Sequence, residues 1–482
     1  MPARIAIFGG SFNPPGVHHR LLAEKLARRF DEVRVIPCGP RPDKEITNSI
    51  PPVFRAALAD ITFGGLHRVA VDLFDLENNT FTRNCDLQTR YEPRGEVWHV
   101  VGADLIAGGA KGRSPIQRTW KNGRKLWQGA RFAVFTRPGC TLDPADLPPH
   151  HELITIDAPG SSTDVRTRLG RSEPVGTMVT PRAHACIERY GLYRAPVPGT
   201  WSPGSLAGAG FLLCADLKNP KAAALAKRLR ANAAKHADPR FILTIGGDGA
   251  MLRGIREHWR RRLPFFGINA GHLGFLMNRS DEITRADFPP RDVIFRLLPM
   301  LYLEFEDERG RVTTDYGFND AWVERATSQS AWLEVTVNGV RRIPKLVSDG
   351  ALVATAAGST AYARSMGASP LLADTPAWLL VGSNVLEPAN WKSALLSTDT
   401  TVEVRSLDPK KRPITAFVDG IAKGPVHALR ARISRAAAVE LVFLSSHDMA
   451  EKIAAIQFNG AAEQPVSSVP SVASVSPVPA RP

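Results

Sequence analysis

The chain has 482 residues, of which 61 are Lys or Arg and 47 are Asp or Glu, so its formal net charge is +14. Hydrophobic residues make up 44% and charged residues 22%, which excludes disordered, collagen-like and fibrous proteins and predicts two or three globular domains. The five cysteines are scattered and form no CxxC pair. This pattern argues against a disulfide framework or a structural metal site and favours reduced thiols.

The apolar runs are far shorter than the ~20 residues that span a bilayer, and the chain enters a strand at once instead of a signal peptide. We therefore expect a cytoplasmic protein without a membrane partner. The positive charge fits either a nucleic-acid surface or an attraction for polyanionic small substrates such as nucleotides. Because no RNP, helix-turn-helix or zinc-finger pattern is present, we favour small substrates and expect no nucleic-acid partner.

Composition divides the chain into five segments. The stretch 195–209 is dense in Pro, Gly and Ser, which is typical of a linker, and 461–482 contains little besides Ala, Pro, Ser and Val, which predicts a disordered tail. We expect an N-terminal domain over 1–194 before the linker, and an α/β subdomain over 210–290 and a β-rich subdomain over 291–460 between the linker and the tail.

The N-terminal segment alternates short apolar runs with helical patterns. Strands are predicted at Arg4–Gly9, Glu32–Pro37, Val69–Leu73, Val97–Val101 and Arg131–Phe135, with a helix over about His18–Arg29. This order predicts an α/β fold with a doubly wound parallel sheet. Ligands of such sheets bind beyond the carboxyl ends of the strands, so Gly9-Gly10 and Gly102–Asp104 should line one crevice.

Two stretches of this domain suit a nucleoside triphosphate. The segment from Gly9 to Arg20 joins a strand, a glycine turn and a helix start that carries two imidazoles, and the free N–H groups of a helix start attract phosphate. Ser161–Arg166 places hydroxyls at a second helix start with an arginine one turn later. Each piece alone is more often structural; the combination is not.

With Gly10-Ser-Phe-Asn-Pro14 and His19, Val101–Asp104, Trp120 and Ser161–Arg166, residues 3–193 resemble the nicotinate/nicotinamide mononucleotide adenylyltransferases. The resemblance implies transfer of AMP from ATP to the mononucleotide with Mg²⁺. It implies that His19 stabilises the transferring phosphate and that the ATP and mononucleotide contacts come from Gly9, Gly10, Ser11, Phe12, His18, Asp104, Trp120, Ser161, Ser162, Thr163 and Arg166.

One position departs from that family. Its usual HxGH pattern places a first histidine where this chain has Gly16, and a glycine where it has His18. His18 could supply the missing imidazole, or the domain could be a degenerate nucleotide-binding or regulatory module. Loss of one transition-state donor costs ~10²–10³ in rate.

The C-terminal part begins as an α/β unit and then becomes β-rich. A strand at Gly210–Ala215, a helix at Pro220–Lys235 and a strand at Phe241–Ile245 lead into Gly246-Gly-Asp-Gly249. Later alternating runs, at Leu301–Glu306, Leu333–Asn338, Thr401–Ser406 and Ile414–Asp419, predict an antiparallel domain. The basic run Arg256–Arg262 is interpreted as a solvated helix face or an attractor for ATP.

A GGDG turn after a strand offers phosphate contacts around one carboxylate, although a buried turn Asp is the ordinary alternative. Here it is followed in order by Gly267–Leu276, Phe318–Asp320, Ser348–Gly350, Thr355–Tyr362 and Arg412–Gly420. In this order, residues 210–445 resemble the NAD kinases. The resemblance implies transfer of the γ-phosphate of ATP, or of polyphosphate, to the 2′-hydroxyl of the adenosine ribose of NAD.

A ribose hydroxyl is a poor nucleophile, so Asp248 is the candidate general base. Phosphate contacts are assigned to Gly246, Gly247 and Gly249, and NAD contacts to Asn319, Asp320, Ser359, Thr360, Tyr362, Asp349 and Asp419. We thus expect a fusion of two enzymes of one pathway, with ATP, NAD and nicotinate or nicotinamide mononucleotide as ligands and a homo-oligomeric state implied by the resemblance. The alternative is a monofunctional kinase with a degenerate N-terminal domain.

Overall fold

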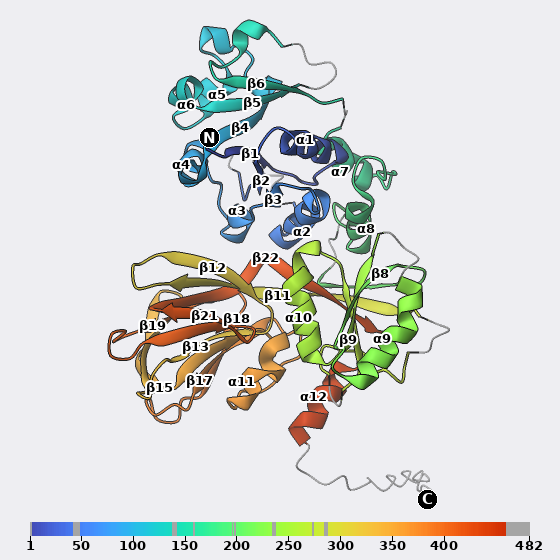
Figure 1. The fold of residues 1–482 in the computed structure, drawn as a ribbon, viewed down its shortest axis with the longest axis vertical. Coiled ribbons are helices and arrows are strands. Elements are labelled where there is room, and N and C mark those ends of the chain that lie inside the picture. Colours follow the sequence, from blue (N-terminus) through green and yellow to red (C-terminus); the bar gives the residue numbers. More distant parts are fainter. Residues whose placement is uncertain are drawn as a thin grey trace, which may run out of the picture.

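The computed structural model describes residues 2–41, 49–136, 142–157, 160–194, 196, 199–233, 238–271, 274–283 and 288–458. The tail predicted over 461–482 and Cys140 lie outside the described residues. The other four cysteines are free thiols. Figure 1 shows the N-terminal domain stacked on the C-terminal half, with helices α2 and α8 facing strand β22 and helix α10.

The N-terminal domain is the predicted α/β unit with a doubly wound parallel sheet of six strands, in the order β3-β2-β1-β4-β5-β6. The order reverses between β1 and β4, which places the carboxyl ends of these two strands side by side. The elements are β1 (Arg4–Gly10), α1 (Val17–Ala27), β2 (Glu32–Pro37), α2 (Pro52–Phe63), β3 (Val69–Val71), α3 (Phe74–Glu77), α4 (Asn84–Tyr91), β4 (Glu96–Gly102), α5 (Pro115–Thr119), α6 (Gly123–Gly129), β5 (Arg131–Thr136), β6 (His151–Thr155), α7 (Ser162–Gly170) and α8 (Pro181–Arg189).

The segment 195–209 is not a simple linker. Within it, β7 (Trp201–Gly204) pairs antiparallel with β11 (Val293–Glu306) of the C-terminal half. A short segment rich in Pro and Gly can serve as an edge strand, because only one of its sides must form hydrogen bonds. The prediction of a linker, which rested on composition, is therefore wrong for the four residues of β7.

The C-terminal half contains two sheets. A ten-stranded sheet runs β15-β14-β19-β22-β10-β9-β8, with β11, β12 and β7 attached, and a six-stranded sheet runs β18-β17-β16-β13-β20-β21. The remaining elements are β8 (Phe211–Ala215), α9 (Pro220–Ala233), β9 (Phe241–Gly246), α10 (Asp248–His258), β10 (Phe265–Asn269), β12 (Val312–Gly317), β13 (Asp320–Arg325), β14 (Ala331–Val337), β15 (Val340–Ser348), β16 (Gly350–Ala354), α11 (Tyr362–Ser365), β17 (Ala377–Ser383), β18 (Ser393–Ser397), β19 (Thr401–Ser406), β20 (Ile414–Val418), β21 (Ile421–Val426), β22 (Ala428–Leu444) and α12 (Met449–Phe458).

The two sheets pack face to face around one apolar core. Alternate residues of the strands point inward, as with Leu301 and Leu303 on β11 or Val402 and Val404 on β19, all buried. The long strand β22 pairs with β11 and β19 and also, in parallel, with β10 of the α/β subdomain. The α/β and β-rich subdomains therefore share a continuous sheet.

Strand β22 also forms part of the contact with the N-terminal domain. Between Ile433 and Ala438 its pairing with β11 is interrupted, and the bulged residues need other hydrogen-bond partners. The fully buried carboxylate of Glu77, at the end of α3, supplies them: it accepts hydrogen bonds from Ser434 Oγ (2.5 Å), Arg435 N (3.1 Å) and Ala436 N (3.3 Å). Arg432 forms an ion pair with the same carboxylate.

Two further polar contacts join the domains. Arg262, only 5% exposed, donates to Asp60 of α2 (2.9 Å) and to the carbonyl oxygens of Ala436 and Ala438 (3.1 Å each). Arg189 of α8 pairs with Glu440 of β22 (2.6 Å). Buried charges that are paired on both sides fix one mutual orientation of the two domains.

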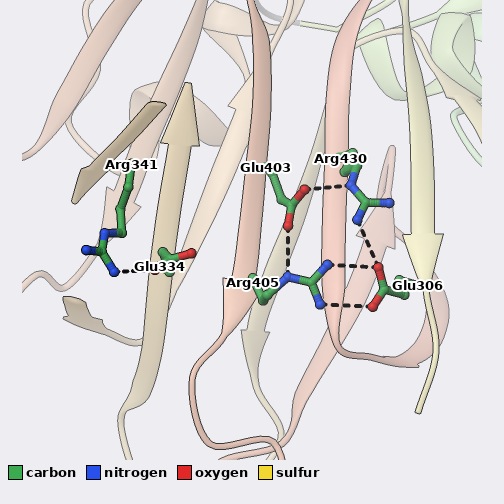
Figure 2. A network of polar contacts seen from close by, with 6 residues as sticks. All are labelled: Glu306, Glu334, Arg341, Glu403, Arg405 and Arg430. Atoms are coloured by element: carbon green, nitrogen blue, oxygen red, sulfur yellow. Dashed lines mark hydrogen bonds and ion pairs between the residues drawn. The ribbon is translucent and has the colours of Figure 1, made fainter. Parts of the chain in front are cut away.

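A network of ion pairs crosses the outer face of the ten-stranded sheet (Figure 2). Arg405 donates to both oxygens of Glu306 (2.8 and 2.9 Å) and to Glu403 (2.8 Å), and Arg430 bridges the same two carboxylates (2.6 and 2.9 Å). The hydrogen bonds from Arg405, with the charges of Arg405 and Arg430, lower the pKa of Glu306 to about 2. An isolated pair, Arg341 with Glu334, lies on neighbouring strands.

This network predicts an acid-sensitive contribution to stability. The pKa of Glu306 is lower in the folded than in the unfolded chain, so its contribution is present above the unfolded pKa of about 4.5 and is lost as pH falls toward 2. After allowance for its partial exposure, Glu306→Gln should cost about 1–2 kcal/mol at pH 7 and less than half of that at pH 3. Urea unfolding at both pH values measures this. Glu334→Gln should change little, and equal costs for the two variants would contradict the network's role.

Candidate functional site

The first candidate site lies where β9 ends and α10 begins. All six residues of β9 are buried, and Gly247 caps α10, whose first residue is Asp248. A Cβ on Gly246 would lie 2.6 Å from the Cβ of Ala250, so only glycine allows this tight turn from strand to helix. The backbone N–H groups at the start of α10 therefore face the carboxyl end of the sheet, where an anion can approach.

The Asp248 carboxylate ties this turn to the following glycine-rich motif. Its two oxygens accept hydrogen bonds from Phe275 N (2.8 Å) and Leu276 N (2.9 Å). Burial raises the pKa of Asp248 above its ordinary value. His272 and Leu273 of the same motif lie outside the described residues. Because a carboxylate has about four lone-pair directions, Asp248 can still accept a further hydrogen bond.

Helix α12 supports this loop from the other side, a contact the sequence analysis missed. Lys452 Nζ donates to the carbonyl oxygens of Gly274 and Met277, both at 2.7 Å. Burial lowers the pKa of Lys452 to about 8, while the Asp248 charge opposes that shift. A single lysine in a ten-residue helix near the end of the chain carries no sequence signal for such a role.

The second cluster forms around Phe318–Asp320 at the start of β13. The Asp419 carboxylate accepts hydrogen bonds from the backbone N–H groups of Phe318 (2.8 Å), Asn319 (2.8 Å) and Asp320 (3.2 Å). Asp419 itself is 3% exposed. It was predicted as an NAD contact, but in the structure both of its oxygens organise the backbone of its neighbours.

A third segment, Thr355–Thr360, packs directly on this cluster. Thr355 Oγ1 donates to Phe318 O (2.7 Å) and accepts from Gly358 N (3.0 Å). A Cβ on Gly358 would lie 2.0 Å from Asn319 O, so glycine is required for this approach. Thr355 was not among the predicted site residues, although its motif was recognised.

The hydroxyls predicted to bind NAD in this turn are used within it. Ser359 Oγ donates to Ala356 O (2.6 Å) and accepts from Leu371 N (2.7 Å), and Thr360 Oγ1 donates to Ala357 O (3.4 Å). By contrast, Asn319 Oδ1 is buried and has no hydrogen-bond partner among the described residues. A buried amide oxygen without a partner is costly, so Asn319 Oδ1 can accept a hydrogen bond from water or a ligand.

The two clusters rest on one apolar core. Met251 of α10 and Met277 of the glycine-rich loop share an apolar core with Phe318 and Ala357. Arg256 of α10 also donates to Asp419 O (2.6 Å). The predicted residues Gly246–Gly249, Asn319, Asp320 and Ser359–Thr360 are thus held on one continuous support.

Tyr362 and Asp349 lie farther out. The Tyr362 ring is 38% exposed and meets Trp322 edge-on at 5.0 Å, close enough to Asp320 to feel its charge. Asp349 lies at the opposite end of the β13–β16 pair, where it forms an ion pair with Arg325 (2.5 Å) and accepts from Asn384 Nδ2 (2.7 Å). Asp349 therefore lies away from Asp320 along this strand pair, although its charge still acts on Tyr362.

Asp320 gives this site a measurable pH signature. Burial, with the neighbouring Asp419 carboxylate, raises the pKa of Asp320 to about 7. A carboxyl group whose pKa is raised on folding destabilises the folded state increasingly as pH rises from its unfolded pKa to its folded pKa. Asp320→Asn should therefore stabilise the ligand-free protein by on the order of 2 kcal/mol at pH 8, and by less than half of that at pH 5. Urea unfolding measures the gain, with Asp399→Asn at an exposed position as control; no gain at pH 8 would refute the burial of a charged Asp320.

The N-terminal candidate site includes the loop between β1 and α1. Arg166 of α7 donates to Asn13 O (2.5 Å) and Thr163 Oγ1 (3.1 Å), and Ser162 Oγ donates to Pro14 O (2.8 Å). Ser161 caps α7 by accepting from Thr163 N (3.1 Å). The Ser161–Arg166 motif and the Gly10–Pro14 motif, far apart in sequence, are therefore bound to each other.

Two imidazoles lie at the start of α1. Gly16 N donates to His19 Nδ1 (3.0 Å), and the rings of His18 and His19 are in contact with centroids 3.9 Å apart. His18 is 4% exposed. A Cβ on Gly16 would lie 2.7 Å from the His18 ring, and one on Gly160 would lie 2.5 Å from it. The His18 ring therefore occupies the space into which a side chain at position 16 would begin to extend.

The other predicted residues of this domain differ in position. Gly9 and Gly10 end β1, and Gly102 ends the adjacent β4, so these glycines and the exposed Asp104 lie at the same edge of the sheet. Phe12, by contrast, is 2% exposed and packs on His19, Phe8 and Phe63, which makes it part of the core. Ser11 and Trp120 are half-buried.

The described part of the chain contains neither a candidate membrane-spanning helix nor a candidate metal site. No helix there combines the length and the apolar character that a membrane crossing requires. No group of three or more His, Cys, Asp or Glu side chains there is arranged to hold a metal ion.

Comparisons with known proteins match both parts of the chain. Residues 209–287 match the model of the ATP-NAD kinase N-terminal domain, and residues 7–168 match the cytidylyltransferase-like model. The NAD kinases of Rickettsia akari and Rickettsia felis are each 33% identical over 229 residues, which cover 48% of this chain and 89% of the relative. A yeast NADH kinase structure in complex with NADH aligns at 14% identity and a TM-score of 0.41, over 78% of this chain and 91% of that chain.

Proposed function

The chain belongs to the NAD kinase family through its C-terminal half, and we propose that this half transfers the γ-phosphate of ATP to the 2′-hydroxyl of the adenosine ribose of NAD. The observation that carries the proposal is the union of Asp248 with the Asn319–Asp320 cluster on one core, with Asn319 Oδ1 left unpartnered. Asn319 accepts a hydrogen bond from NAD, and Asp320 accepts another in its ionised form.

Asp248 acts as the general base. Two backbone N–H groups already fix its side chain, so orienting the carboxylate toward the ribose hydroxyl costs no further side-chain entropy. A raised pKa makes it a stronger base than an ordinary aspartate, which suits proton removal from a ribose hydroxyl. The N–H groups at the start of α10, at Gly247 and Gly249, bind phosphate oxygens, and Mg²⁺ enters with ATP.

Formation of NADP from NAD tests this proposal directly. The full chain is supplied with NAD, Mg²⁺ and either ATP or polyphosphate, and NADP is followed by reduction with an NADP-specific dehydrogenase. NADP formation with either donor supports the proposal and identifies the donor. Folded chain that binds NAD but forms no NADP with either donor would refute it.

For the N-terminal domain we propose transfer of AMP from ATP to nicotinate or nicotinamide mononucleotide. The support is the binding of the Ser161–Arg166 motif to the Gly10–Pro14 loop beside the two imidazoles. His19 stabilises the phosphate under attack, and His18 supplies the second imidazole in place of a side chain at position 16. The rival function, a nucleotide-binding module without turnover, is favoured by Gly16 alone.

Exchange of residues between positions 16 and 18 separates these functions. Gly16→His alone should lower turnover at least tenfold, because its Cβ collides with the His18 ring at 2.7 Å. In the double variant Gly16→His/His18→Gly that ring is gone, so at least half of the activity should return. Dinucleotide formation from ATP and each mononucleotide is the assay. Equal loss in the single and double variants would exclude exchange of the imidazole, and turnover in none, wild type included, would favour the binding module.

Homo-oligomerisation and a cytoplasmic location stay predictions. Light scattering of the purified full chain would measure the mass in solution. A mass of 52.4 kDa would contradict the expected oligomer.

A further inference from the structure

A cavity of about 880 Å³ lies between the two domains, away from both candidate sites. The N-terminal domain contributes the end of α2, the edge strand β3 and the start of α3. The C-terminal half contributes the end of α10, the turn Trp259–Arg261 and strands β11 and β12. Asp248 starts α10 and Glu257 near its end lines the cavity, so the helix separates the two by about 14 Å.

The walls of this cleft carry more positive than negative charge. Five arginines line it against three carboxylates; the arginines are Arg34, Arg94, Arg182, Arg260 and Arg261, and the carboxylates are Asp60, Asp72 and Glu257. Asp60 is already bound by Arg262 (2.9 Å), and Asp72 accepts from Tyr91 Oη (2.5 Å). Arg34 and Arg94 are themselves paired with Glu32, and Arg260 lies 3.7 Å from Asp60, so the excess of positive charge rests on Arg182 and Arg261.

Three of these arginines, one from α8 of the N-terminal domain and two from the turn after α10, gather at the domain boundary. Arg182 donates to the carbonyl oxygen of Arg261, which brings two guanidinium-bearing residues together, and Arg260 donates to Val71 O of β3 (2.8 Å). The Arg261 guanidinium has no hydrogen-bond or ion-pair partner in the described part of the chain. Clustered, exposed guanidinium groups repel one another unless an anion binds them, and their planar donors match phosphate.

Aromatic rings supply the second recognition element. Phe74, at the start of α3, is 41% exposed, which is unusual for a phenylalanine at the wall of a cavity. Tyr316 lies on the opposite wall, half-buried and packed against Trp259 with centroids 5.1 Å apart. The Arg90 guanidinium already covers one face of the Phe74 ring at 4.1 Å, so a planar base joined to phosphates would stack on the other face.

We propose that this interdomain cleft binds a nucleotide with two or more phosphates, its phosphates held by Arg260 and Arg261 and its base against Phe74. The volume lies within the range of about 300–1,000 Å³ that small-molecule sites occupy, and domain interfaces are a preferred location for them. The site is separate from both candidate catalytic sites and does not depend on either proposed activity. ATP, NAD and NADP share this chemistry.

Photolabelling of the full chain with 8-azido-ATP tests the proposal. Label is expected in peptides that contain Phe74 or Tyr316, and Arg261→Ala and Phe74→Ala should each reduce that label at least tenfold. Arg309→Ala, an exposed arginine in the β11–β12 turn, is the matched control and should reduce it less than twofold. Kinase turnover of Arg261→Ala should stay within twofold of wild type, because Arg261 contacts neither candidate site.

Competition then identifies the ligand. ATP, NAD and NADP are added in turn, and the nucleotide that protects at the lowest concentration is the occupant. Inorganic tripolyphosphate should protect at least tenfold less well than ATP; equal protection would overturn the base contact with Phe74. Label confined to peptides of the two candidate catalytic sites, or unchanged in Arg261→Ala, would overturn the site itself.

Discussion

Asp248→Asn is expected to lower the turnover number of NAD phosphorylation by about 10²–10⁴-fold, the usual contribution of a general base. Asparagine keeps the size of the side chain but cannot take the proton of the ribose hydroxyl. Its amide nitrogen would also face one of the two N–H donors, Phe275 N or Leu276 N, so a small loss of stability of about 1 kcal/mol should accompany the loss of turnover.

The control for this variant lies in the same region of the chain. Asp281→Asn removes an exposed carboxylate that pairs with Arg279 and touches neither cluster of the site. It should leave NADP formation within twofold of wild type. Turnover of Asp248→Asn within tenfold of wild type, in protein with an unchanged thermal transition, would exclude Asp248 as the base.

Glu77→Ala is expected to have the largest effect on stability, a loss of about 3–5 kcal/mol in the free energy of unfolding. The fully buried carboxylate accepts hydrogen bonds from Ser434 and from two backbone N–H groups of the β22 bulge, and it neutralises Arg432. Its removal leaves these donors buried without partners. The urea transition of the full chain measures the loss.

A second variant distinguishes this contact from a general effect of lost charge. Glu308→Ala removes an exposed carboxylate from the β11–β12 turn and should cost less than 0.5 kcal/mol. If Glu77→Ala also costs less than 1 kcal/mol, the bulge is satisfied in another way and the domains are not held by this carboxylate.

Strands such as β9 could be predicted because they are buried apolar runs bounded by turns, whereas exposed strands such as β12 and β18 were not predicted. All six residues of β9 are buried, and Gly246 and Gly358 mark places where a Cβ would collide with a neighbour. The motifs could be recognised in the sequence for a similar reason. Their glycines stand where two backbone segments approach too closely for a Cβ.

The parts that could not be predicted depend on long-range contacts. The oxygens of Ser359 and Asp419 bind backbone groups that the sequence does not place beside them, and their assignment to NAD stays a prediction. Glu77 is one of many acidic residues until the fold brings it to the bulge of β22. The strand β7 has the composition of a linker and is defined only by its partner β11.

The basic run Arg256–Arg262 shows the same limit. It was interpreted as a solvated face or an attractor for ATP, and it divides between three environments. Arg256 binds Asp419 O within the candidate site, Arg262 is buried at the domain interface, and Arg260 and Arg261 line the interdomain cleft. Helical spacing alone cannot distinguish these environments, because each neighbour comes from a different part of the chain.

The central claim, that one chain carries out two successive reactions, is tested most directly with mononucleotide as the only pyridine substrate. Wild-type chain is supplied with ATP, Mg²⁺ and nicotinamide mononucleotide, and NAD and NADP are separated and quantified. The account predicts NADP in wild type, accumulation of NAD alone in Asp248→Asn, and neither product in His19→Ala, which should still convert added NAD to NADP. Nicotinate mononucleotide in a parallel reaction should give its dinucleotide if that is the preferred substrate. No dinucleotide from either mononucleotide, in chain that phosphorylates added NAD, would contradict the claim and leave the N-terminal domain without the proposed reaction.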